Sequence, residues 1–94
     1  MKDITLVIPA KNESESLPKV LSELKSYNVK KIVVIPPDDQ ETINAIKNFE
    51  CKILSQKGKG FGNALIQGIN EVETKYFCIF NADGSFNPKY LAEL

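Results

Sequence analysis

Residues 76–84 read Tyr76-Phe77-Cys78-Ile79-Phe80-Asn81-Ala82-Asp83-Gly84. The first five residues of this stretch are almost wholly apolar and end at turn residues, which predicts a buried strand. Asn81 and Asp83 follow the carboxyl end of that strand, where ligands bind in open α/β sheets. Side-chain oxygens two residues apart can both turn toward one hard cation or its bound phosphates. The alternative is an ordinary strand-to-helix turn, since turns favour Asn, Asp, Gly and Ser.

The composition sets limits on the class of protein. The 94 residues suffice for one small domain. Lys plus Arg balances Asp plus Glu at 12 each, so we expect no nucleic-acid partner. The chain has no histidine, which excludes a His-based triad and Cys/His zinc sites, and we expect no disulfide between Cys51 and Cys78. The apolar run at 4–10 is too short for a membrane span, so we expect a cytoplasmic protein, at the membrane surface if a longer chain exists.

The rest of the chain alternates between strand and helix patterns. We expect strands at 4–8, 31–35, 51–54 and 76–80, and helices at about 17–27, 40–49 and 63–72, with another beginning near Pro88. Strands and helices alternating at this spacing predict a parallel sheet with right-handed crossovers. The expected fold is therefore α/β, a three-layer αβα arrangement around an open, mainly parallel, Rossmann-like sheet.

Several residues are expected to shape the helices. Ser16 is the expected N-cap of the first helix, and Asp38 or Asp39 is the expected N-cap of the second. Gly68 falls inside the third helix, where glycine costs about 1 kcal/mol relative to alanine. A close approach of that helix to the sheet would explain this glycine.

The fourth expected strand has no obvious outer neighbour, and the last helix pattern is short. An exposed apolar strand edge invites pairing with another chain. We therefore expect either the N-terminal part of a longer protein or a subunit that completes its sheet as a homo-oligomer.

The loops after the strands would line one crevice, because parallel strands end at the same edge of a sheet. The loop 58–62 is rich in glycine and precedes a helix, with Lys57 and Lys59 beside it, which favours a phosphate cradle. It lacks the P-loop pattern, and a flexible surface turn is the alternative. The loop 9–13 and the Asp38-Asp39 pair could bond a base edge or a ribose hydroxyl, although helix capping is favoured for the aspartates.

Three segments together resemble one family. Residues 8–13 (I-P-A-K-N-E), 58–68 (G-K-G-F-G-N-A-L-I-Q-G) and 81–91 (N-A-D-G-S-F-N-P-K-Y-L) are similar to the I-P-A-Y-N-E, glycine-rich and D-A-D-x-S-x-x-P motifs of inverting, family 2 type glycosyltransferases with the GT-A fold. The last form most resembles the dolichyl- or polyprenyl-phosphate mannosyl- and glucosyltransferases. The resemblance covers nearly the whole chain.

The resemblance implies that the crevice binds a UDP- or GDP-sugar for transfer to an acceptor such as polyprenyl phosphate. Asp83, with Asn81 at an outer position, would bind Mg²⁺ or Mn²⁺, which would neutralise charge on the leaving nucleoside diphosphate. By the same resemblance, the nucleotide-sugar would contact Pro9, Ala10, Lys11, Asn12, Glu13, Asp38, Gly58, Lys59 and Ala82.

The chain departs from the family pattern at Asn81, at Ile35-Pro36-Pro37 and at Lys59, which falls one position away from the family's usual lysine. Asn81 stands where the family usually has Asp, and Ile35-Pro36-Pro37 stands where the family carries the carboxylate that holds the nucleotide. The family's catalytic base lies downstream of its metal motif, so residues 1–94 resemble a single nucleotide-sugar-binding domain truncated on the acceptor side, with no catalytic residue of its own.

Two other functions are alternatives to a glycosyltransferase. A non-catalytic nucleotide-binding or oligomerising α/β module derived from a glycosyltransferase would tolerate both departures. A sugar-phosphate nucleotidyltransferase is disfavoured, because the loop after the first strand reads Pro9-Ala10-Lys11-Asn12-Glu13 and lacks the required glycines and arginine.

Overall fold

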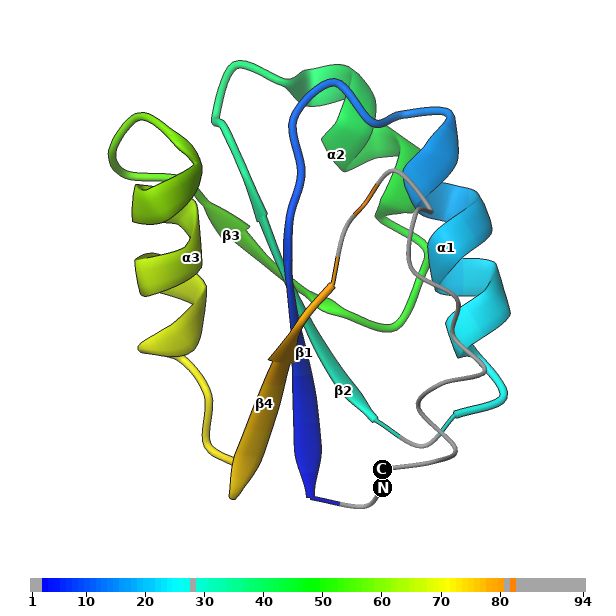
Figure 1. Ribbon diagram of the computed structural model, residues 1–94. Coiled ribbons are helices and arrows are strands. Elements are labelled where there is room, and N and C mark those ends of the chain that lie inside the picture. Colours follow the sequence, from blue (N-terminus) through cyan, green and yellow to red (C-terminus); the bar gives the residue numbers. More distant parts are fainter. Residues whose placement is uncertain (1–2, 28, 81, 83–94) are drawn as a thin grey trace.

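The computed structural model describes residues 3–27, 29–80 and 82 and forms three layers (Figure 1). A parallel sheet in the order β3-β2-β1-β4 is the middle layer. Helices α1 and α2 lie on one face of the sheet and α3 lies on the other. The predicted α/β fold is therefore confirmed. The elements are β1 (Ile4–Pro9), α1 (Ser16–Leu24), β2 (Lys30–Ile35), α2 (Gln40–Ile46), β3 (Lys52–Ser55), α3 (Phe61–Ile69) and β4 (Tyr76–Ile79).

The strand β1 lies at the centre of the sheet and pairs with β2 on one side and β4 on the other. Leu6, Val7 and Ile8 are fully buried, because both faces of the strand are covered by helices. Leu6 and Ile8 belong to the larger core beneath α1 and α2. A strand buried on both faces accounts for the continuous apolar run in the sequence.

The prediction that residues 76–80 form a buried strand is only partly right. Tyr76, Phe77 and Ile79 are exposed by 57%, 46% and 41%, because β4 is an edge strand and α3 packs over β1 and β2 instead. Phe80 is fully buried and joins the core beneath α1, and Cys78 packs against the same core. The apolar run is therefore exposed at Phe77 and Ile79 on one face, whereas the other face is exposed at Tyr76 and buried at Phe80.

The first two helices are shorter than predicted. Helix α1 ends at Leu24 and not at residue 27, because Tyr27 N–H bonds back only three residues, to the Leu24 carbonyl at 3.0 Å. Helix α2 ends at Ile46 and not at residue 49, because Phe49 N–H likewise bonds back only three residues, to the Ile46 carbonyl at 2.9 Å. Such i−3 turns are common at helix ends. Helix α3 lies earlier in the chain than predicted, at Phe61–Ile69 instead of 63–72.

The cap of α1 was predicted wrongly. Glu15 occupies the N-cap position without a side-chain cap bond, and Ser16 is the first helical residue. The Ser16 hydroxyl bonds elsewhere, to the Glu13 side chain and to the carbonyl of Ala82. The cap of α2 is Asp39, whose carboxylate accepts from Thr42 N–H at 3.4 Å.

Three further expectations concern a disulfide, membrane-spanning segments and the last helix. Cys51 and Cys78 are both free thiols, as expected. Among the described residues, none of the helices is long and apolar enough to cross a bilayer. The helix expected near Pro88 lies outside the described residues.

Gly68 allows α3 to lie directly on the sheet. A Cβ atom built at this position would be 2.5 Å from Val7 Cγ1 and 3.2 Å from Val34 Cγ2. Both valines belong to the two central strands, and neither can move without disturbing the core. The predicted close approach of helix to sheet is confirmed.

We expect Gly68→Ala to destabilise the protein by about 1–2 kcal/mol, because overpacking against Val7 outweighs the better helix propensity of alanine. Gly62→Ala in the same helix is the matched control, since a Cβ there meets no atom within 4 Å. That variant should be neutral or more stable by up to about 1 kcal/mol. Urea unfolding of both variants checks the prediction, and equal effects of the two would contradict it.

Candidate functional site

A hollow in the described surface lies at the carboxyl ends of β1, β2 and β3. This cleft has a volume of about 910 Å³ and is formed by the loops that follow the three strands. Its lining residues are Pro9, Ala10, Lys11, Pro36, Pro37, Asp38, Gln56, Lys57, Gly58, Lys59, Gly60, Phe61 and Ala64. Parallel α/β sheets bind ligands at this edge.

The cleft contains most of the residues predicted to bind a nucleotide-sugar. Those that line it are Pro9, Ala10, Lys11, Asp38, Gly58 and Lys59. Asn12, Glu13 and Ala82 lie outside its lining. Asn81 and Asp83, the predicted metal ligands, lie outside the described residues.

A second hollow, of about 540 Å³, lies near the amino ends of the strands. Its charged side chains have both signs, and Lys52 Nζ pairs with a Glu71 carboxylate oxygen at 2.8 Å. None of the predicted site residues lines this second hollow, so the cleft at the carboxyl ends of the strands is the candidate site.

Backbone hydrogen bonds fix the loop after β1 to the start of α2. Asn12 N–H donates to Asp39 Oδ2 at 2.7 Å, and Glu13 N–H donates to Thr42 Oγ1 at 3.1 Å. Asn12 adopts a φ of 57°, a left-handed conformation that Asn tolerates better than most residues. The two aspartates therefore differ in role: Asp39 holds the loop and caps α2, while Asp38 is exposed in the cleft lining.

The contacts of Asp39 change its acidity. Partial burial acts to raise the pKa of Asp39, but hydrogen bonds from the Asn12 backbone and from Thr42, with the charge of Lys11, outweigh it. The pKa of Asp39 is therefore lowered from its ordinary value.

Ser16 connects the loop after β1 to the segment after β4. Its hydroxyl lies 2.9 Å from the Ala82 carbonyl oxygen and also contacts the Glu13 carboxylate. Ala82 is only 4% exposed. Ala82 lies between the two predicted metal ligands in the sequence, so this contact places their neighbour beside the first turn of α1.

Side-chain amides organise the glycine loop after β3. Gln56 Nε2 donates to the carbonyls of Gly58 and Gly60, at 3.1 Å and 3.0 Å, and Asn63 Nδ2 donates to the Lys59 carbonyl at 2.7 Å. Gly60 has a φ of 91°, which favours glycine. Gln56 was not among the predicted site residues, although it follows closely on the predicted third strand.

Phe61 is another cleft residue that the sequence analysis did not select. It begins α3, lines the cleft and is 60% exposed. Its signal in the sequence was an aromatic residue between two glycines, just before the helix predicted at 63–72.

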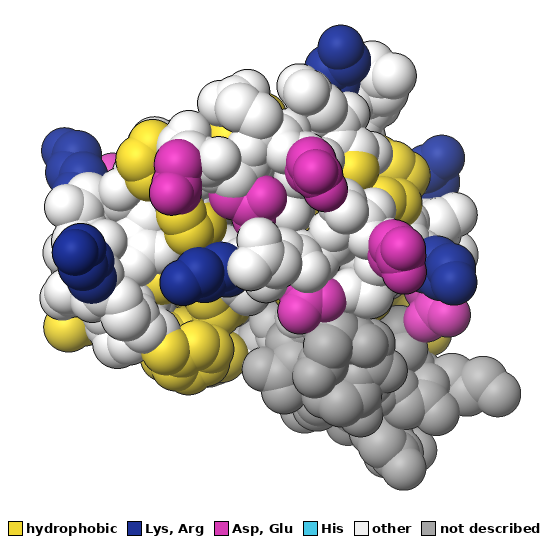
Figure 2. Space-filling model, turned by 90° about the horizontal axis from the view of Figure 1, so that it is seen from above, with side chains coloured by type: hydrophobic (Ala, Val, Ile, Leu, Met, Phe, Trp, Pro, Cys, Tyr) yellow, Lys and Arg dark blue, Asp and Glu magenta, His cyan; other side chains and the backbone are white. Residues whose placement is uncertain are grey.

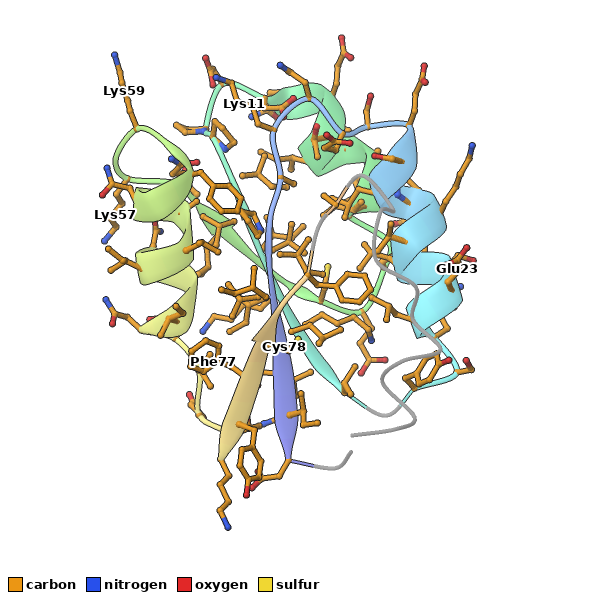
Figure 3. The ribbon with its side chains drawn as sticks, viewed as in Figure 1. Lys11, Glu23, Lys57, Lys59, Phe77 and Cys78 are labelled. Carbon is orange, nitrogen blue, oxygen red and sulfur yellow. The ribbon has the colours of Figure 1, made fainter. Side chains whose placement is uncertain are left out.

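The lysines around the cleft do not converge on one point. Lys59 extends outward from the tip of the loop before α3, and Lys11 lies on the loop after β1 (Figure 3). Seen from the carboxyl ends of the strands, the surface carries both basic and acidic side chains (Figure 2). The cleft therefore offers separate cations within a mixed surface and no strong field of one sign.

Metal-binding side chains are not clustered in the described ranges 3–27, 29–80 and 82. No three Cys, Asp or Glu side chains among these residues come together as a set that could hold an ion. The carboxylates of Glu13 and Asp39 bond to the Ser16 hydroxyl and to the Asn12 and Thr42 backbones, respectively.

Comparison with known proteins gives a consistent family. Residues 5–94 match the family described as Glycosyl transferase family 2. An uncharacterized glycosyltransferase of Mycobacterium tuberculosis (strain H37Rv) is 30% identical over 95 residues, which cover 97% of this chain and 43% of that protein. An uncharacterized protein of Methanocaldococcus jannaschii is 32% identical over 92 residues, which cover 93% of this chain and 38% of that protein. The chain therefore spans less than half the length of these relatives.

We expect Asp39→Asn to destabilise the protein by about 1 kcal/mol at pH 7, because the amide keeps one oxygen and loses the acceptor for either Asn12 N–H or Thr42 N–H. Because the folded-state pKa is lowered, the stability from Asp39 is present above the unfolded pKa and is lost as pH falls through the folded pKa. Urea unfolding of wild type and variant at pH 7 and pH 2.5 should therefore show a difference that shrinks in acid. Asp38→Asn is the matched control, and a difference that stays constant with pH would contradict the prediction.

Proposed function

The chain belongs to glycosyl transferase family 2, and from this we propose that it forms the donor-binding part of a glycosyltransferase that uses a UDP- or GDP-sugar. One observation carries the proposal: three loops that are distant in sequence form one cleft at the carboxyl ends of the strands. The volume of about 910 Å³ falls in the range of small-molecule sites.

The cleft suggests how the donor is divided among the loops. We propose that Pro9, Ala10 and Lys11 contact the nucleoside on one side and that Asp38 accepts hydrogen bonds from its base or ribose. Gly58 and Lys59 would contact the diphosphate, since backbone N–H groups before a helix favour anions. Asn12 and Glu13 would act by holding the loop after β1, because their backbones bond to Asp39 and Thr42.

We further propose that Asp83 and Asn81 hold Mg²⁺ or Mn²⁺ together with the donor phosphates. Carboxylate and amide oxygens suit these hard cations. When bound, the metal would offset the charge that develops on the leaving nucleoside diphosphate. The contact of Ser16 with Ala82 supports this placement, because it ties the residue between the two ligands to the helix that follows the β1 loop.

The acceptor side is proposed from the family alone. We propose polyprenyl phosphate as the acceptor, as in the branch that the motif at 81–91 most resembles. No residue of the chain is assigned as catalytic base, so transfer would require groups from the rest of a longer protein or from another chain. Cytoplasmic location, at the membrane surface in a longer protein, stays a prediction.

We expect Asp83→Ala to weaken binding of UDP- or GDP-sugar at least tenfold in the presence of Mn²⁺, because the metal would lose its only carboxylate ligand. Titration calorimetry with and without Mn²⁺ measures this, and the wild type should bind only weakly without metal. Asp3→Ala, an exposed aspartate at the other end of β1, is the control. Metal-independent binding that Asp83→Ala leaves unchanged would count against the proposal.

The alternative of a non-catalytic, oligomerising module is favoured by one observation. β4 is an edge strand whose outward face exposes Phe77 by 46% and Ile79 by 41%. Apolar edge strands pair readily with other strands. We propose that a second copy of the chain pairs there when no other segment covers the edge.

We expect wild type to self-associate at high concentration and Phe77→Lys to be largely monomeric, because a charge on an edge strand opposes pairing. Ile66→Lys is the control, since Ile66 is 60% exposed but lies on α3. Sedimentation velocity over a hundredfold concentration range measures the effect. A wild type that stays monomeric throughout would refute the pairing.

A further inference from the structure

We propose that Gln56 is a positioning residue that makes the glycine loop a donor surface for the diphosphate of the ligand. This inference rests on the proposed function, because it concerns the same cleft. Gln56 lines the cleft, and its own N–H donates to the Ile35 carbonyl at 2.8 Å. That bond continues the pairing of β2 with β3 and fixes the backbone from which the side chain projects.

Three carbonyls of the loop accept hydrogen bonds from side-chain amides, and that of Gly60 also accepts from Ala64 N–H at 3.3 Å. Gln56 donates to the carbonyls of Gly58 and Gly60, and Asn63 donates to the Lys59 carbonyl. Three successive carbonyl oxygens, which would repel a phosphate, are therefore turned toward two amide groups.

The peptide geometry then determines where the N–H groups point. In a planar trans peptide the N–H of one residue points opposite to the carbonyl of the residue before it. The carbonyls of Gly58, Lys59 and Gly60 face the amides, so the N–H groups of the three residues 59–61 face away from them. Within the part of the chain that the structure describes, these N–H groups donate no hydrogen bond.

The arrangement suits a phosphate for two reasons. Successive backbone N–H groups that are left without a partner in the protein can bind an anion, and α3 begins at Phe61 with the positive end of its dipole at the loop. A second side-chain amide, that of Gln67, holds the residues just before the glycine loop. It accepts from Lys57 N–H at 2.9 Å and donates to the Ser55 carbonyl at 2.7 Å. Gln56 thus acts through the loop and need not touch the ligand.

Two variants of Gln56 separate this role from general stability. Gln56→Glu keeps the shape of the side chain but has no N–H to donate, and Gln56→Met removes the donor without adding charge. NMR titrations of the full chain with UDP and GDP, and with uridine and guanosine, all in Mg²⁺, compare ligands with and without a diphosphate. The control is Asn48→Asp, an exposed amide-to-carboxylate change after α2.

We expect both Gln56 variants to lose about tenfold in affinity for the better nucleoside diphosphate and less than twofold for its nucleoside, roughly the effect of one or two charge-assisted hydrogen bonds. Equal loss for both ligands would show a merely structural role and overturn the inference. Wild-type affinity in both variants would overturn it as well and leave the proposed function intact. A wild type that binds neither nucleotide would refute the proposed function and the inference together.

Discussion

The pairing of β1 on both of its edges is the constraint on which the rest of the molecule depends. β1 aligns in parallel with β2 from Thr5↔Lys30 to Pro9↔Val34 and with β4 from Ile4↔Tyr76 to Val7↔Ile79. A strand paired on both edges and covered on both faces must be apolar at every position of its middle, and Leu6, Val7 and Ile8 are fully buried. The same pairing brings the ends of the strands to one edge, where the cleft forms.

The arrangement of strands and helices could be predicted from sequence because it follows from periodicity. The stripe of Leu17, Val20, Leu21 and Leu24 is buried as its spacing predicts, and Gly68 lies against Val7 as a glycine inside a helix suggested. The exposed face of β4 was missed for a physical reason. An apolar run reads the same whether a helix covers one face or both, and only the position of α3 over β1 and β2 decides between them.

The site was less predictable than the fold. Residue types and strand ends were enough to find the cleft, because parallel strands impose a common edge. The hydrogen bonds around the cleft join residues that are distant in sequence, such as Asn12 to Asp39 and Ser16 to Ala82. Such bonds cannot be predicted from local sequence patterns. Ser16 shows the difficulty: its type and position suit an N-cap, but its hydroxyl serves two other partners in the folded chain. The roles of Asn81 and Asp83 stay predictions, since they lie outside the described residues.

The position of β1 in the sheet also bears on how the chain folds during synthesis. β1 is synthesised before its neighbour β4 and cannot pair with it until Tyr76 has been made, because Ile4 pairs with Tyr76. Contacts between residues so far apart in sequence form slowly, since a long loop must close before they are gained. Until then one edge of the apolar central strand is open, and a nascent chain in that state is a natural client for chaperones that recognise extended apolar segments.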